Sequence, residues 1–232
     1  MTSTVSIPTL SGGDEFSAYV ARPAGDAKAA IIVIQEIFGV NAGIRRKCDL
    51  LAEQGYLAVA PDLFWQLERG IELDPDVEPE FKRALDLMGQ FDPDGGVRDI
   101  EAAIRWARSE TGGKKVGAVG YCLGGKLAYM TAARTDSDAS VGYYAVGVPD
   151  MLGEAKAIAN PLMLHIPEED GFVDKAAQKA MHDGLDDHPK VTLHDYPGLD
   201  HGFATQFGDR RDDAGATLAD ERTDAFFAQH LG

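Results

Sequence analysis

Apolar strand-like runs alternate with amphipathic helical segments along most of the chain. The clearest run, Ala30–Gln35 (AIIVIQ), is uninterrupted, as in a strand that is covered on both faces. Asn41 can cap the helix that follows, which ends at Gly55, and the next strand is Leu57–Ala60. This alternation predicts an α/β fold with a mainly parallel central sheet and helices on both faces.

The rest of the chain continues the pattern. Further helices are expected over Glu80–Gln90, Val97–Arg108, Gly124–Ala133, Lys175–Leu185 and Asp213–Leu231. Further strands are expected over Val116–Gly120, Val141–Val146, Pro161–Ile166 and Val191–Tyr196. Two short strands, Thr4–Ile7 and Phe16–Val20, surround a Ser-Gly-Gly-Asp turn, which predicts a hairpin and an antiparallel N-terminal edge. The stretch from Leu63 to Pro79 has no clear period, and we expect a long functional loop there.

Length and charge limit the classes of protein that fit. At 232 residues we expect one domain, residues 1–232. Lys and Arg number 22 against 38 Asp and Glu, a net charge of −16, which argues against nucleic-acid and anionic-membrane partners. Cys48 and Cys122 are too few for a disulfide framework or a four-cysteine zinc site. With no apolar signal or spanning segment in view, we expect a cytoplasmic protein.

The strongest local motif is Gly120-Tyr121-Cys122-Leu123-Gly124-Gly125, which follows an expected strand and opens an expected helix. This is the G-x-S-x-G nucleophile elbow with Cys in place of Ser. At a helix N-terminus the dipole favours a thiolate at Cys122, and the N–H of Leu123 can face an oxyanion. The alternative is a buried structural cysteine beside packing glycines. We interpret Cys48, inside the expected helix Gly43–Gln54, as structural.

In an α/β-hydrolase sheet the acid and then the histidine follow the nucleophile along the chain. His201 is the histidine that lies in a loop past a strand in that order, and its neutral imidazole could take the thiol proton. His165 and His194 fall within strands, and we expect His165 to be a hydrogen-bonded core residue. The remaining histidines fall on helices or helix ends, where solvation is expected: His182, His188 and His230. Position alone leaves the acid open among Asp170, Glu168, Glu169 and Asp174.

Five motifs in order resemble the dienelactone hydrolase family of α/β-hydrolases, which includes carboxymethylenebutenolidase-like enzymes. They are Gln35-Glu36-Ile37-Phe38-Gly39-Val40-Asn41, Ala60-Pro61-Asp62-Leu63, the Cys122 elbow, Asp170-Gly171-Phe172-Val173 and His201-Gly202-Phe203. The resemblance implies the α/β-hydrolase fold and a triad of Cys122, His201 and Asp170. It also implies that Glu36 contacts the thiol and helps it to ionise when substrate binds, which protects the thiol from oxidation. The N–H of Ile37 would be the second oxyanion donor beside Leu123. Otherwise Glu36 is a loop carboxylate that pairs with Arg45 or Arg46.

The sequence departs from the family where well-known members hold the carboxylate of dienelactone with two arginines. Thr205 stands at one of these positions and Phe81 at the other, with Lys82 and Arg83 just behind. Neither Thr nor Lys reproduces a bidentate guanidinium clamp, so we expect a less charged substrate. The candidate pocket residues are aromatic, and the alternative for each is core packing: Phe38, Phe64, Trp65, Phe81, Tyr144 and Phe203.

The resemblance therefore implies a hydrolase of small-molecule esters or lactones that works through an acyl-cysteine. We expect no metal or organic cofactor, and a monomer. Two alternatives remain: a thioesterase or promiscuous carboxylesterase with the same machinery, or a non-catalytic ligand or redox sensor on the same fold.

Overall fold

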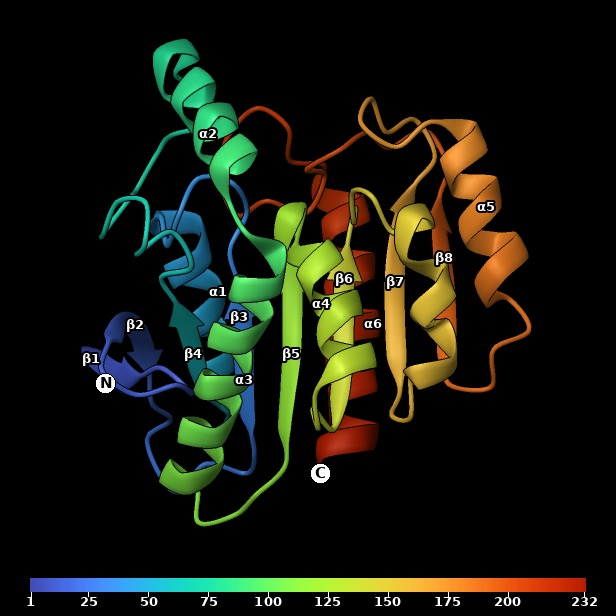
Figure 1. The fold of residues 1–232 in the computed structure, drawn as a ribbon. Helices are drawn as coiled ribbons and strands as arrows, with labels where there is room; N and C mark the ends of the chain where they lie inside the picture. Colours follow the sequence, from blue (N-terminus) through green and yellow to red (C-terminus); the bar gives the residue numbers. More distant parts are fainter. The chain divides into compact units, whose positions relative to one another are not determined.

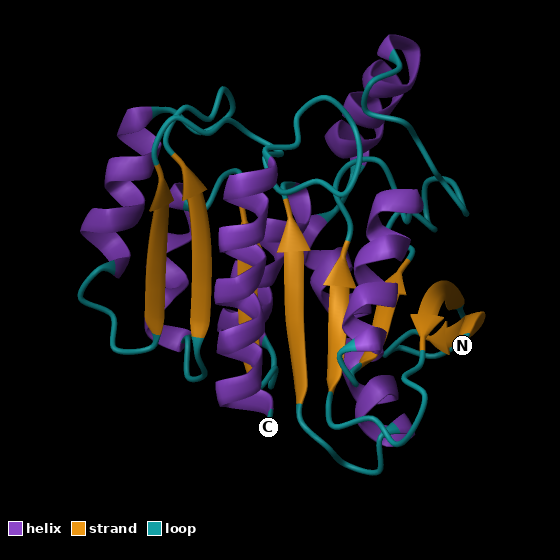
Figure 2. Cartoon of the chain, turned by 180° about the vertical axis from the view of Figure 1, so that it is seen from behind, coloured by secondary structure: helices purple, strands orange, loops and turns teal.

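The computed structural model describes residues 1–232 and divides into two compact units, Met1–Gly117 and Ala118–Gly232 (Figure 1). Whether the chain acts as the single domain that its length predicts stays a prediction. Each unit combines strands with helices on both faces of its strands, as the alternation in the sequence predicts (Figures 1 and 2).

The first unit begins with an antiparallel hairpin. Strand β1 (Thr2–Pro8) pairs with β2 (Glu15–Ala21) along its whole length, so that Thr2 faces Ala21. Strand β2 pairs antiparallel with β4 (Leu57–Pro61), and β4 pairs parallel with β3 (Ala30–Ile34). The strand order is β1-β2-β4-β3, which confirms the predicted antiparallel edge. Every residue of β3 and β4 is buried, as their uninterrupted apolar sequences predict.

Three helices complete the first unit. Helix α1 (Ala42–Glu53) begins as predicted at Asn41, whose side chain accepts the N–H of Ile44 at 3.2 Å. Helix α2 (Glu78–Gln90) ends the long loop, and α3 (Pro93–Glu110) packs against β3 and β4. Figures 1 and 2, seen from opposite sides, show α1 and α3 on opposite faces of these strands.

The second unit holds parallel strands. Strand β5 (Val116–Tyr121) leads into this unit, and the order continues through β6 (Ala139–Tyr143), β7 (Leu162–Pro167) and β8 (Val191–Tyr196). The pairings β6–β7 and β7–β8 are parallel. Helices α4 (Leu123–Arg134) and α6 (Asp213–Leu231) lie on opposite faces of β6, and α5 (Lys175–Leu185) packs against β8 (Figures 1 and 2).

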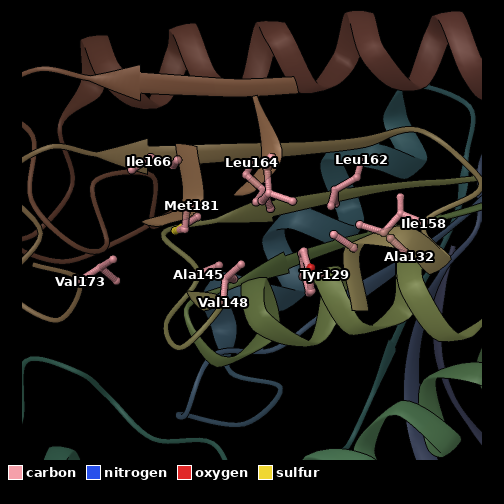
Figure 3. Packing of buried hydrophobic residues seen from close by; sticks show 12 residues of the cluster. Tyr129, Ala132, Ala145, Val148, Ile158, Leu162, Leu164, Ile166, Val173 and Met181 are labelled. Carbon is pink, nitrogen blue, oxygen red and sulfur yellow. The ribbon is translucent and has the colours of Figure 1, made fainter. Parts of the chain in front are cut away.

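The core of the second unit shows why β7 separates two environments. Leu162, Leu164 and Ile166 point to one face, where they join Tyr129 of α4 and Met181 of α5 in an apolar cluster (Figure 3). The alternate residues of a strand point to the opposite face, toward the side of α6.

One local expectation is wrong, and one element was not predicted. The strand expected over Val141–Val146 ends at Tyr143, because the next residue, Tyr144, adopts a left-handed backbone with φ 37°. A 3-10 helix over Pro149–Ala157 follows, where no element is predicted. None of the helices has both the length and the apolar character that crossing a bilayer requires.

Candidate active site

Cys122 lies on a strained turn between β5 and α4. Its backbone angles, φ 56° and ψ −113°, fall outside the regions that non-glycine residues favour, a cost of about 1–3 kcal/mol. Close packing holds the turn, because a Cβ on Gly120 would lie 1.9 Å from the Gly124 carbonyl oxygen, and one on Gly125 would lie 2.6 Å from that of Tyr143. The N–H of Cys122 donates to the same Tyr143 oxygen at 3.1 Å. The side chain is half-buried.

His201 and Asp170 lie together in the second unit, as the family resemblance implies. His201 Nδ1 is 2.9 Å from Oδ2 and 3.1 Å from Oδ1 of Asp170, and both side chains are buried. The N–H groups of Phe172 and Val173 donate to Asp170 Oδ1 at 2.8 and 3.2 Å. The carboxylate is therefore fixed and can hold the imidazole in one tautomer.

The three other candidates for the acid occupy different positions. Glu168 and Glu169 are near Lys175, at 3.9 and 3.6 Å, toward solvent. Asp174 caps α5 by accepting the N–H of Ala177 at 2.8 Å. Among these carboxylates, Asp170 alone contacts His201.

The charges around His201 favour its protonated form. Burial lowers the pKa of its imidazole, but hydrogen bonds to Asp170 and Cys122, together with the charges of these two groups, raise it to about 10. That a neutral imidazole takes the thiol proton stays a prediction. The same interactions couple His201 to both Cys122 and Asp170, so the three side chains form one electrostatic group.

The rings of Tyr144 and Phe172 contact the His201 imidazole, and the Asp200 carboxylate holds the His201 backbone. The sequence does not predict the roles of Phe172 and Asp200. The rings of Tyr144 and Phe172 lie 4.9 and 4.7 Å from the imidazole, and Phe172 is 52% exposed. Asp200 Oδ1 accepts the N–H of Gly171 at 3.0 Å and that of His201 at 2.6 Å, so it links the loop of Asp170 to the loop of His201. The D-x-F-V motif contains Phe172, but only tertiary structure shows its contact with His201.

In the first unit, Glu36 and Ile37 follow β3 in a loop that the buried Gln35 holds. The Gln35 amide donates to the carbonyl oxygen of Glu36 at 3.2 Å, and Leu63 N–H donates to Gln35 Oε1 at 3.1 Å. Glu36 is 9% exposed. The cations suggested as alternative partners bind other carboxylates, since Arg45 pairs with Glu72 and Arg46 with Glu53.

The loop between β4 and α2 is anchored at several points. Asp62 accepts the N–H of Phe64 at 3.1 Å and that of Gly70 at 2.8 Å. The N–H of Leu73 donates to the Phe38 carbonyl oxygen at 2.9 Å. Burial raises the pKa of Asp62, while the two backbone N–H groups and Arg69 oppose that rise. These hydrogen bonds therefore hold the loop in a fixed conformation.

The aromatic candidates separate into two kinds. Phe38 and Phe81 contact each other at 5.8 Å, and Tyr144 and Phe203 do so in the second unit, also at 5.8 Å. Phe64 is fully buried against Phe91, and Trp65 donates its indole N–H to Asp99 at 2.7 Å. Phe64 and Trp65 therefore have structural contacts that account for their positions, and Tyr144 and Phe203, each 1% exposed, are also core residues.

The profile of the Dienelactone hydrolase family matches residues 16–231. The chain belongs to the dienelactone hydrolase family. A relative from Azospirillum brasilense is 46% identical over 98% of this chain and 99% of its own length. The carboxymethylenebutenolidase of Pseudomonas putida is 38% identical over 98% of this chain and 97% of its own length. A crystal structure from Klebsiella pneumoniae has a TM-score of 0.88 at 26% identity, and the match covers 99% and 98% of the two chains. This member of the dienelactone hydrolase family is thus an α/β-hydrolase that acts on ester or lactone bonds.

Proposed function

We propose that this dienelactone hydrolase family member cleaves its substrate through an acyl-cysteine formed on Cys122, with His201 as acid and base and Asp170 as the group that orients it. The observation that carries this proposal is the buried His201–Asp170 contact of 2.9 Å, on a histidine that is also hydrogen-bonded to Cys122. A structural cysteine would have no need for a strained turn or for an oriented histidine.

The proposed reaction has two steps, acylation of Cys122 and hydrolysis of the acyl-enzyme. The Cys122 thiolate attacks the carbonyl carbon, the ester C–O bond breaks, and the leaving oxygen takes the proton from His201. In a lactone the freed hydroxyl stays on the acyl chain. Water then attacks the thioester carbonyl, gives a proton to His201 and expels the thiolate, which releases the acid and restores the starting state. Asp170 keeps the proton on Nδ1 and stabilises the imidazolium.

We propose that the backbone N–H groups of Leu123 and Ile37 bind the oxyanion. Leu123 is the first residue of α4, so its N–H has no acceptor within the helix and the helix dipole adds positive potential there. The Gln35 contacts support the role of Ile37, because they fix the peptide that precedes it. We assign to Glu36, on the same loop, control over the ionisation of the Cys122 thiol.

We propose that the natural substrate carries less charge than dienelactone. Lys82, which could replace a missing arginine, is 71% exposed and pairs with Glu78 at 2.6 Å. Arg83 pairs with Glu68 at 2.5 Å. Both cations are therefore neutralised by carboxylates of this chain. Among the aromatic candidates, Phe38 and Phe81 remain to contact the acyl group.

The test compares kcat/KM for dienelactone with kcat/KM for its neutral methyl ester, in the wild type and in Cys122→Ala. We expect the neutral ester to be preferred and the variant to be inactive on both. Quenched-flow mass spectrometry should detect the acyl group on the peptide that contains Cys122. A preference for the anion would refute the substrate proposal alone. Full activity of Cys122→Ala would refute the catalytic assignment, and a thiol that no ester acylates would favour a sensor.

A further inference from the structure

A groove of about 460 Å³ lies in the second unit between α6 and the outer strands β7 and β8. Its lining comes from the two strands, from the residues just before each of them, and from the second half of the helix. None of Cys122, Asp170 and His201 contributes to it. The volume falls within the range of small-molecule sites, about 300–1,000 Å³.

The groove exists because α6 covers only part of this face of the sheet. The helix is tied to β6 and β7 at Thr223, whose hydroxyl is hydrogen-bonded to Tyr143 at 2.6 Å and to His165 at 3.0 Å. Figure 2 shows α6, which ends at the C-terminus, beside the two outermost strands, with no helix across them on this side. The side chains that alternate away from the apolar core therefore line an open surface, Met163 on β7 and Thr192 and His194 on β8.

The charge of this groove is opposite to that of the protein. The lining includes Lys190, Arg222, His194 and His230 but no carboxylate, although the chain carries 38 acidic and 22 basic residues. Elsewhere most arginines pair with carboxylates, namely Arg22, Arg45, Arg46, Arg83, Arg98, Arg105, Arg134 and Arg211. Arg222 instead lies over the Tyr196 ring at 5.2 Å and is hydrogen-bonded to the Tyr196 hydroxyl, and neither it nor Lys190 forms an ion pair.

The uncompensated charge acts on its neighbours. Burial and the nearby Arg222 lower the pKa of His194, while Asp195 opposes this. The His194 imidazole stacks on the ring of His165, with 5.8 Å between the ring centroids. A bound anion would relieve the repulsion between Arg222 and protonated His194, which gives the site a direct titration signal.

The other walls of the groove are apolar. Phe226 is 7% exposed and Met163 is 5% exposed, and Pro161, Pro189 and Ala225 complete this surface. The Phe226 ring contacts that of His230 at 4.6 Å. Cationic groups beside a proline, methionine and phenylalanine surface suit a molecule with a carboxylate at one end and an apolar ring at the other.

We propose that this groove is a second binding site, separate from the catalytic residues, for a small organic carboxylate with an apolar or aromatic body. Arg222 and Lys190 bind the carboxylate, and Phe226 and Met163 contact the body of the ligand. A carboxylic acid is also the product class of an ester hydrolase, so the site can respond to the acids that accumulate around such an enzyme.

The test is an NMR titration of the imidazole resonances with benzoate, and with benzamide as the neutral analogue of the same shape. His194→Gln identifies the His194 signals. We expect benzoate to shift the resonances of His194 and His230 saturably, with a dissociation constant in the low millimolar range or tighter, and to raise the pKa of His194. We expect benzamide to have no such effect.

Matched variants locate the contact. Arg222→Gln, which retains a hydrogen-bond donor for Tyr196, should weaken benzoate binding by about tenfold or more, and Lys190→Gln should weaken it less. Lys179→Gln removes the same charge from α5, where Lys179 pairs with Asp183, and should leave binding unchanged. Repeating the titration on Cys122→Ala excludes effects that pass through the nucleophile.

Several results would overturn the proposal. These are no saturable shift, equal shifts from benzamide, or unchanged binding in Arg222→Gln. Equal binding of inorganic phosphate would remove the role of the apolar walls. A dimer in sedimentation that Arg222→Glu dissociates would show that a second copy of the chain covers the groove instead.

Discussion

Gly120→Ala tests whether the close approach of β5 and α4 positions the nucleophile. The added Cβ would lie 1.9 Å from the Gly124 oxygen and 2.3 Å from the Gly124 carbon, and both are backbone atoms. Real Cβ atoms essentially never come within 3.0 Å of such atoms, so the start of α4 must move by at least 3.0 − 1.9 = 1.1 Å. Overpacking of this kind costs about 1–3 kcal/mol, and a displacement of about 1 Å at a reacting group costs about 10²-fold in rate.

Urea unfolding measures the loss in the free energy of unfolding, and kcat on a fixed ester measures the effect on the folded enzyme. We expect Gly120→Ala to lower the free energy of unfolding by at least about 1–3 kcal/mol. We also expect the folded variant to have a kcat about 10²-fold below that of the wild type. Gly153→Ala is the matched control, because a Cβ there meets nothing within 4 Å. Wild-type stability and kcat in Gly120→Ala would refute the argument that this contact sets the position of Cys122.

Three further predictions concern the groups around His201 and one distant histidine. Asp170→Asn should lower kcat by up to about 10⁴-fold and should lower the His201 pKa, measured by NMR, because it removes the buried charge that orients the imidazole. Phe172→Ala should change the unfolding free energy by less than about 1 kcal/mol, since the ring is 52% exposed, yet lower kcat several-fold; unchanged kinetics would show that the ring does not hold His201. His182 lies 2.9 and 3.0 Å from two carboxylates; burial lowers its pKa, but these carboxylates raise it above 6.5 overall. Its stabilisation is therefore complete below pH 6.5 and is lost as the pH rises through the folded-state pKa. His182→Gln should destabilise the protein at pH 5.5 by less than about 1 kcal/mol and have a smaller effect at pH 9, while a larger effect at pH 9 would reverse the sign.

Caps mark the starts of several helices, but the sequence predicted these starts unequally. Helix α5 begins at the predicted Lys175, where Asp174 offers its carboxylate to the Ala177 N–H, and α6 begins at the predicted Asp213, where Asp212 accepts the N–H of Gly215 at 2.7 Å. Helix α3, which Asp92 caps, begins at Pro93 rather than at the predicted Val97. The turn at Tyr144 was missed because nothing in Tyr-Tyr-Ala-Val requires φ 37°. There the surrounding tertiary structure overrides a local preference for a longer strand.

The contrast between local sequence signals and tertiary contacts also applies to the candidate site. The order of motifs, together with the family resemblance, predicted that Asp170 and His201 would meet, and the structure places them in contact. The tertiary contacts around His201 could not be predicted, because the Phe172 ring meets its imidazole, and Asp200 accepts the N–H of Gly171, only after two separate loops fold together. The basic groove could not be predicted from the sequence either, because it depends on how much of β7 and β8 is left uncovered by α6.

The contacts of Asp200 have a consequence for how substrate preference can change in this protein. A single oxygen of Asp200 holds the backbone at Gly171 and at His201, so two loops separated by a helix and a strand share one anchor. Altering the length of either loop alone would displace the other and disturb the contact between His201 and Asp170. An engineer who wishes to transplant a new pocket into this scaffold should therefore exchange the two loops together, as one cassette that carries its own aspartate.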